Sequence, residues 1–179
     1  ALSTAQIAVL TTAQIVALTT AQVNQGLTTG QIVALSTTQV AVIETGDIAA
    51  LTTAHVAALT TSQIKQGLST VQLVALGSAQ IAALTTAQTS LGLTTAQIVA
   101  MTTEQFANLK TAQLAAMSTA QIAAIELLDL QALTTVQFPN LSLTQLKALT
   151  LDQANALTTA QIDALTTTQQ AANTYITVT

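Results

Sequence analysis

Apolar and polar positions follow one another in a fixed order along this chain, in an eight-residue phrase that reads Leu-Thr-Thr-Ala-Gln-Ile-Xaa-Ala. Twenty-one copies occur in succession, spaced by eight residues except for three steps of nine. The Gln of the phrase is replaced in three copies, by Asp47, His55 and Asp129. A short fixed period is the signature of a repeat architecture, in which each copy forms one structural unit.

Each copy carries a complete signal for the start of a helix. In the copy at residues 10–17, Thr11 is followed three residues later by Gln14, which is the capping-box spacing. Leu10 before the cap and Ile15 four positions after it form a hydrophobic staple. A new start every eight residues leaves room for helices of about six residues, which are not stable alone in water. Neighbouring copies must therefore stack and bury each other's apolar side chains.

Two columns of the repeat are the predicted core. The slot before the cap is apolar nearly throughout, as at Leu51, and so is the slot after Gln, as at Ile48. The slot two residues after Gln accepts residues as different as Val16, Lys65 and Asp163, and is expected to face solvent.

These patterns predict an all-α solenoid of very short capped helices over residues 1–165, followed at 166–179 by a degenerate last repeat and a β-prone tail. A β-solenoid is the alternative, because paired threonines favour strands. However, the Leu and Ile of each copy are five residues apart, and this odd spacing would place them on opposite faces of a strand. In one continuous helix the apolar stripe would rotate by about 80° per copy and wind around the rod, so no partner could cover it. A single long helix is therefore not expected. The number of copies per solenoid turn is left open.

Two kinds of irregularity interrupt the pattern. The three nine-residue copies each contain a glycine, namely Gly26, Gly67 and Gly92, which predicts a left-handed helix end and a wider, more hydrated corner. Pro139 lies five positions after the cap Thr134 and predicts a helix that ends early.

Composition excludes several classes of function. Charged residues are 6% of the chain, against about a quarter in typical soluble domains, and only three are basic, so nucleic acid is not an expected partner. No apolar run approaches the roughly 18 residues that span a bilayer, and no secretory leader opens the sequence, so such a signal is absent or already removed. A surface with so little charge favours association of the chain with itself.

Few residues suggest chemistry. His55 is the only histidine, so it lacks a second metal ligand or a catalytic partner. Asp47 and Asp129 occupy Gln slots at helix starts, where a carboxylate suits both the cap and the dipole. Three serines, Ser3, Ser36 and Ser118, occupy cap slots and are not nucleophile candidates. We therefore expect no catalytic, cofactor or metal site, no small-molecule substrate, and no enzymatic activity.

Threonine recurs at the first helical position, and we interpret it as supporting the helix starts. The set includes Thr12, Thr20, Thr29, Thr37, Thr53 and Thr61. Stacked in a solenoid, these residues would form a regular array of hydroxyl and methyl groups, so an ice- or surface-binding array is an alternative function. A protein- or peptide-binding solenoid is another, with a groove lined by the variable slot that holds Lys65 and Asp163.

The phrase Leu-Thr-Thr-Ala-Gln-Ile-Xaa-Ala-Leu, over roughly residues 1–170, resembles repeat tracts of large bacterial surface and secreted proteins of the adhesin type. This resemblance implies an extracellular structural role, as the stalk of a surface protein or a subunit of a fibre or sheath, and it carries over no catalytic residue. The first residues are already a standard octad without a polar cap, which predicts end-to-end stacking or a fragment of a longer array.

Overall fold

The computed structural model describes residues 2–172, and each of the twenty-one octads forms one short helical element there. The elements are α-helices of four to six residues, three π-helical turns and one 3-10 turn. No strand occurs in residues 2–172. The predicted all-α solenoid is confirmed, and the β-solenoid alternative is not supported.

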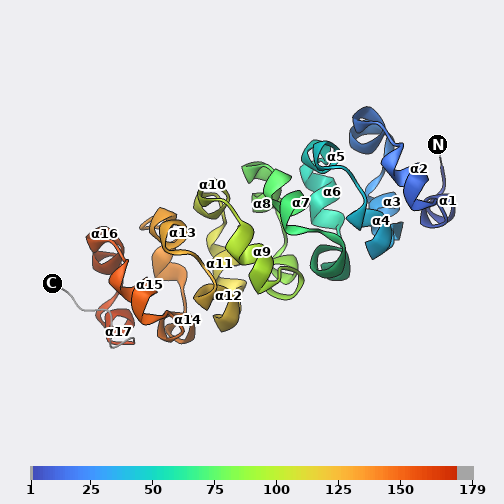
Figure 1. The fold of residues 1–179 in the computed structure, drawn as a ribbon. Coiled ribbons are helices and arrows are strands. Elements are labelled where there is room, and N and C mark those ends of the chain that lie inside the picture. The colour runs from blue at the N-terminus through green and yellow to red at the C-terminus, as the bar shows by residue number, and fades with distance from the viewer. Residues whose placement is uncertain (1, 173–179) are drawn as a thin grey trace.

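Three octads make one turn of the solenoid, which answers the question that the sequence left open. Helices three copies apart pack on each other, as α1 does on α3 and α6 does on α8, so equivalent elements stack in three columns. Figure 1 shows the resulting rod, with α1 and α17 at opposite ends.

The bounds of the elements follow the three columns. The first column contains α1 (Thr4–Ala8), α3 (Thr29–Ala34), α6 (Thr53–Ala58), α8 (Ser78–Ala83), α10 (Thr103–Ala107), α13 (Leu127–Ala132) and α15 (Leu151–Asn155). The second contains α2 (Thr12–Val16), α4 (Thr37–Ala41), η2 (Gln63–Gly67), η3 (Gln88–Gly92), α11 (Thr111–Ala116), η4 (Phe138–Asn140) and α16 (Thr159–Asp163). The third contains η1 (Gln22–Gly26), α5 (Thr45–Ala50), α7 (Thr70–Ala75), α9 (Thr95–Ala100), α12 (Thr119–Ala123), α14 (Leu143–Lys147) and α17 (Thr167–Gln170).

The helices begin where the capping boxes predict. At α2, the Gln14 N–H donates to Thr11 Oγ1 at 3.3 Å, and the Thr11 N–H donates to Gln14 Oε1 at 2.9 Å. The Gln half of the box persists where the cap residue has no hydroxyl, as at α11, where the Lys110 N–H donates to Gln113 Oε1 at 2.7 Å. The departures are α5 and α13, which lack both halves of the box: the side chains of Glu44 and Glu126 do not cap these helices, and no Gln is present three residues later.

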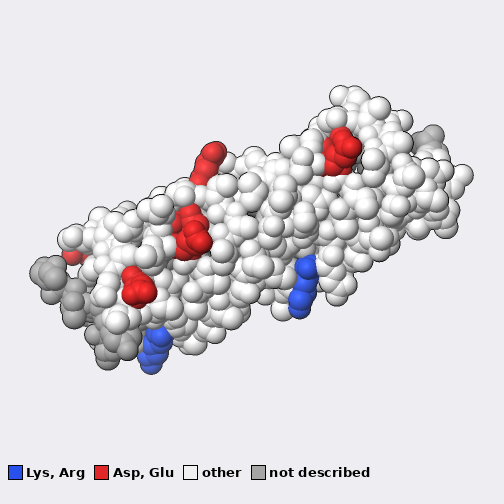
Figure 2. Space-filling view, viewed as in Figure 1, with Lys and Arg blue, Asp and Glu red and all other residues white. Residues whose placement is uncertain are grey.

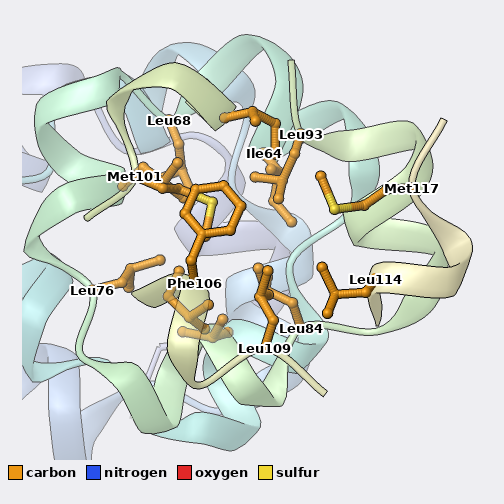
Figure 3. Packing of buried hydrophobic residues seen from close by; sticks show 14 of the residues in the cluster. Ile64, Leu68, Leu76, Leu84, Leu93, Met101, Phe106, Leu109, Leu114 and Met117 are labelled. Carbon is orange, nitrogen blue, oxygen red and sulfur yellow. The ribbon is translucent and has the colours of Figure 1, made fainter. Parts of the chain in front are cut away.

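The two predicted core columns are confirmed. Most residues after the Gln are almost completely buried, as are most residues before the cap, and together they form one continuous apolar cluster along the rod. Figure 3 shows these side chains converging from successive helices around Phe106. Thr89 and Gln170 are the polar residues that follow the repeat Gln. Thr89 is fully buried, and its Oγ1 donates to the Thr85 carbonyl at 3.1 Å. The variable slot is exposed at Lys65 and Asp163, as predicted.

The prediction of left-handed glycine caps is wrong. No glycine in the described residues has a positive φ. The ninth residue instead widens the helical turn, so that the Leu68 N–H donates to the Gln63 carbonyl five residues back at 2.9 Å. Nor are these corners more hydrated at Gly67 and Gly92, which are buried against the preceding turn. A Cβ on Gly67 would lie 3.1 Å from Val40 Cβ, so the glycine permits close stacking of the backbones.

The irregular copies near the C-terminal end keep their place in the solenoid. Pro139 lies in η4, a 3-10 turn that replaces the α-helix of that copy, in agreement with the prediction of an early end. Beyond the predicted boundary at 165, α17 still has both bonds of a capping box, at Thr166 and Gln169. Most of the β-prone tail, residues 173–179, lies outside the described residues.

Candidate functional site

The most specific side-chain geometry in the molecule belongs to the repeated Gln. Gln121 is 3% exposed, and its Oε1 accepts the Ser118 N–H at 2.7 Å to cap its own helix. Its Nε2 donates to the carbonyls of Thr89 and Leu93, each at 2.7 Å, in the preceding turn. One amide therefore hydrogen-bonds to a backbone N–H at the start of one helix and to backbone carbonyls at the end of a helix in the preceding turn. The last four carbonyls of any helix lack partners within that helix.

This arrangement recurs along the rod from α3 onward. At α4, Gln39 Nε2 donates to the carbonyls of Ile7 (3.0 Å) and Leu10 (2.8 Å). At α16, Gln161 Nε2 donates to those of Leu130 and Leu133, both at 2.8 Å. The capping-box pattern predicts the Oε1 contact but does not predict the inter-turn contact. A signal for it exists, because a capping box accepts Glu as well as Gln, yet eighteen of the twenty-one slots hold Gln and none holds Glu.

His55 replaces a Gln and performs both of its functions. Its Nε2 lies 3.0 Å from the Leu27 carbonyl of the preceding turn, so this nitrogen carries the proton and donates. Its Nδ1 then accepts the Thr52 N–H at 3.3 Å, as the Gln Oε1 does elsewhere. The ring is 4% exposed, and both nitrogens are used by the backbone, which leaves neither free for a metal or a substrate.

The two aspartates in Gln slots are buried like the Gln residues that they replace, but they have no amide N–H to donate to the preceding turn. Asp47 is 6% exposed and Asp129 is 5% exposed. Asp129 Oδ1 accepts the Thr103 hydroxyl of the preceding turn at 2.7 Å. Burial raises the pKa of Asp129 and the charge of Glu126 adds to this, while the Thr103 hydrogen bond lowers it. A carboxylate cannot donate to carbonyls, so these two copies have a weaker link to the turn before them.

The serines and threonines lie where the cap pattern places them. The hydroxyls of Ser3, Ser36 and Ser118 accept the N–H of the Gln three residues later and make no hydrogen bond to a histidine or carboxylate among the described residues. Threonine at the first helical position stacks without interruption in the second column only, as Thr12, Thr37, Thr61, Thr86, Thr111, Thr135 and Thr159. Elsewhere serine or leucine interrupts the series, as at Ser78 and Leu127.

Charge is distributed unevenly around the rod. Four of the seven acidic residues lie in the first column: Glu104, Glu126, Asp129 and Asp152. The three lysines lie in the second and third columns. Figure 2 shows acidic side chains following one side of the rod over α10, α13 and α15, with basic side chains on the opposite side. A surface groove of about 420 Å³ opens between α13 and α15 on this acidic side.

Within residues 2–172, no three His, Cys, Asp or Glu side chains gather in a way that would hold a metal ion. None of the helices in the same range combines the length and the hydropathy that crossing a bilayer requires. Neither Lys65 nor Asp163, which were predicted to line a groove, lines the one between α13 and α15.

Comparison with known proteins supports the repeat organisation of the chain. A protein-family model described as the ALTTAQ repeat matches residues 1–25, 40–65 and 122–159. The chain is thus similar to a repeat family in three separate segments, one of which includes the irregular copies around Glu126 and Pro139. No curated protein and no solved structure matches the chain.

Proposed function

We propose that this chain is a structural spacer at the bacterial cell surface, either the stalk of an adhesin-type protein or a subunit of an extracellular fibre. One observation carries the proposal: from α3 onward the Gln amide, or the His55 ring in one copy, joins most turns to the turn before through the same pair of contacts. An array joined in this way grows in length by the addition of copies and needs no new type of contact.

The expected dimensions follow from helix packing. Packed helices lie about 8–10 Å apart, so each turn of three octads adds roughly that length. Seven such turns give a rod of about 60–70 Å. Each turn covers the apolar face of its neighbours, because a single octad cannot bury enough surface to fold alone. A spacer of this kind resists bending without disulfides or metals.

Small-angle X-ray scattering tests the spacer role. The purified chain is expected to scatter as a rod, and insertion of three further consensus octads after Leu109 is expected to lengthen it by about 10 Å at constant cross-section. Equal growth in all dimensions would contradict the proposal. Negative-stain microscopy distinguishes its two forms, since a fibre subunit polymerises end to end and a stalk segment stays monomeric.

The surface location has its own test. Brief protease treatment of intact cells that produce the protein is expected to remove it, while a cytoplasmic enzyme of the same cells survives. Retention of the full-length chain until the cells are lysed would contradict an extracellular role.

The unbroken threonine series of the second column favours a second candidate, an ice- or surface-binding array. It predicts thermal hysteresis and faceted ice growth in the presence of the purified protein, and loss of both when Thr86 and Thr135 are replaced by leucine. Ice growth identical to that in buffer would exclude it. Lys110 beside Thr111 and the exposed Val136 beside Thr135 interrupt the regular surface, so we rank this function second.

A further inference from the structure

The first column of the solenoid changes character at α13 and α15. Leu127 and Leu151 occupy the first helical position, where most copies have threonine, and Leu128 occupies the next. Their side chains are 43%, 50% and 72% exposed, so they contribute little to the core. Because α13 and α15 pack on each other in adjacent turns, the three leucines concentrate apolar surface in one place.

A groove lies beside these leucines, between the start of α13 and the start of α15. Leu127 and Leu128 line it, and the buried Ile125 and Gln153 form its inner side. Glu126 and Asp152 stand at its edge, one from each turn. Its volume of about 420 Å³ accommodates a few side chains of a partner and is open to solvent.

The two carboxylates at the edge are uncompensated. Neither the Glu126 nor the Asp152 side chain makes a hydrogen bond or an ion pair with another described residue. Lys65 and Lys110 belong to the second column and Lys147 to the third, so no lysine shares their column. An apolar groove edged by unpaired negative charge is complementary to an apolar side chain flanked by cations.

We propose that this groove, defined by Glu126, Leu127, Leu128 and Asp152, docks a short segment of another protein in which an aliphatic or aromatic side chain lies between two basic residues. A second copy of this chain fits poorly, because its three lysines lie in separate copies of the repeat: Lys65 and Lys110 share a column two turns apart, and Lys147 belongs to a different column. The inference does not depend on the spacer role, since a rod of any function can carry such a site.

Titration of the full isotope-labelled chain with a probe peptide, acetyl-Gly-Lys-Leu-Phe-Lys-Gly-amide, tests the site by amide NMR. Saturable shifts are expected at residues 125–128 and 150–153. A peptide with Glu in place of both Lys, and another with Ser-Ser in place of Leu-Phe, are expected to bind at least about fivefold more weakly. Added salt is expected to weaken the first complex, because the carboxylates are exposed.

Matched variants locate the contact. The double variant Glu126→Gln with Asp152→Asn, and separately Leu127→Thr, are each expected to weaken binding about fivefold or more. Glu44→Gln changes a glutamate that precedes a helix of the third column and, like Glu126, does not cap it. Leu143→Thr changes a leucine of α14 whose exposure is close to that of Leu127. Both control variants are expected to leave binding unchanged. The amide spectrum of each variant reports whether it is folded.

Three results would overturn the proposal. The acidic peptide could bind as well as the basic one, or the control variants could weaken binding as much as the groove variants. Alternatively, the same amides could shift with protein concentration alone, which would make a second copy the occupant.

Discussion

Replacement of one buried Gln is expected to remove both the helix cap and the inter-turn hydrogen bonds that its amide makes. Gln121→Ala deletes the acceptor of the Ser118 N–H and the donor to the carbonyls of Thr89 and Leu93. In the described part of the chain, the Ser118 N–H and the Leu93 carbonyl have no other hydrogen-bond partner. A buried backbone group left unsatisfied costs about 1–3 kcal/mol, so the loss of the partners of these two groups should lower the free energy of unfolding by about 2–6 kcal/mol.

Gln14→Ala is the matched control. Gln14 Oε1 caps α2 through the Thr11 N–H at 2.9 Å, but its side chain is exposed and makes no inter-turn hydrogen bond with any residue from 2 to 172. Its removal is expected to cost about 0.5–1 kcal/mol, the usual value of one exposed capping contact. Urea unfolding followed by circular dichroism measures both losses. Hydrogen exchange of the Ser118 amide reports the local opening, which matters in a repeat array that need not unfold in one step.

Gln121→Glu gives a sharper test, because it keeps the size and the capping oxygen of the side chain. The second oxygen of a carboxylate would face two buried carbonyls, so the pKa of this glutamate is expected to rise above its ordinary value of about 4.3. A raised pKa in the folded state means that the loss of stability is largest at neutral pH and shrinks as pH falls through that pKa. Equal effects of Gln121→Ala and Gln14→Ala, or a pH-independent effect of Gln121→Glu, would refute the inter-turn function.

Three further predictions concern the irregular copies. Gly67→Ala is expected to lower stability by about 1–3 kcal/mol, because its Cβ would meet Val40 at 3.1 Å, while Gly26→Ala, with nothing closer than 3.7 Å, is expected to be neutral or stabilising in urea unfolding. Asp129→Asn is expected to stabilise the chain at pH 7, because burial raises the pKa of the carboxyl that it replaces. The gain in stability should disappear as pH falls through this raised pKa towards about 4. Thermal unfolding over a pH series measures the gain, and a gain that is constant with pH would contradict this prediction. His55→Gln is expected to be nearly neutral and His55→Ala to cost about 2–4 kcal/mol in calorimetry, and similar losses for both would show that the ring has no Gln-like function.

The local structure was readable from the sequence because its causes lie within one octad. The cap at Thr11, the amide of Gln14 and the apolar pair Leu10 and Ile15 all act over five residues, so their pattern predicts where a helix begins and which face it buries. The same reasoning correctly placed the exposed variable slot at Lys65.

The features that sequence reasoning missed depend on contacts across a turn. Nothing within the octad specifies three copies per turn, and this number decides that Gln121 reaches Thr89 and that Gly67 approaches Val40. The glycine caps were predicted wrongly for this reason: the local rule for helix ends suggested a backbone conformation, whereas the position requires space for the neighbouring turn. The groove beside Leu127 likewise needs two turns to exist.

The direction of the Gln contacts bears on how such a chain is made. From Gln31 onward, the Nε2 of each repeat Gln donates to carbonyls about 30 residues earlier in the sequence, as Gln161 does to Leu130, so its acceptors have already been synthesised when the glutamine emerges. Each new turn can therefore be completed on the one before it while translation continues, and the distance between bonded residues stays the same however many copies follow. A ribosome can thus produce a very long member of this architecture with no more topological difficulty than a short one.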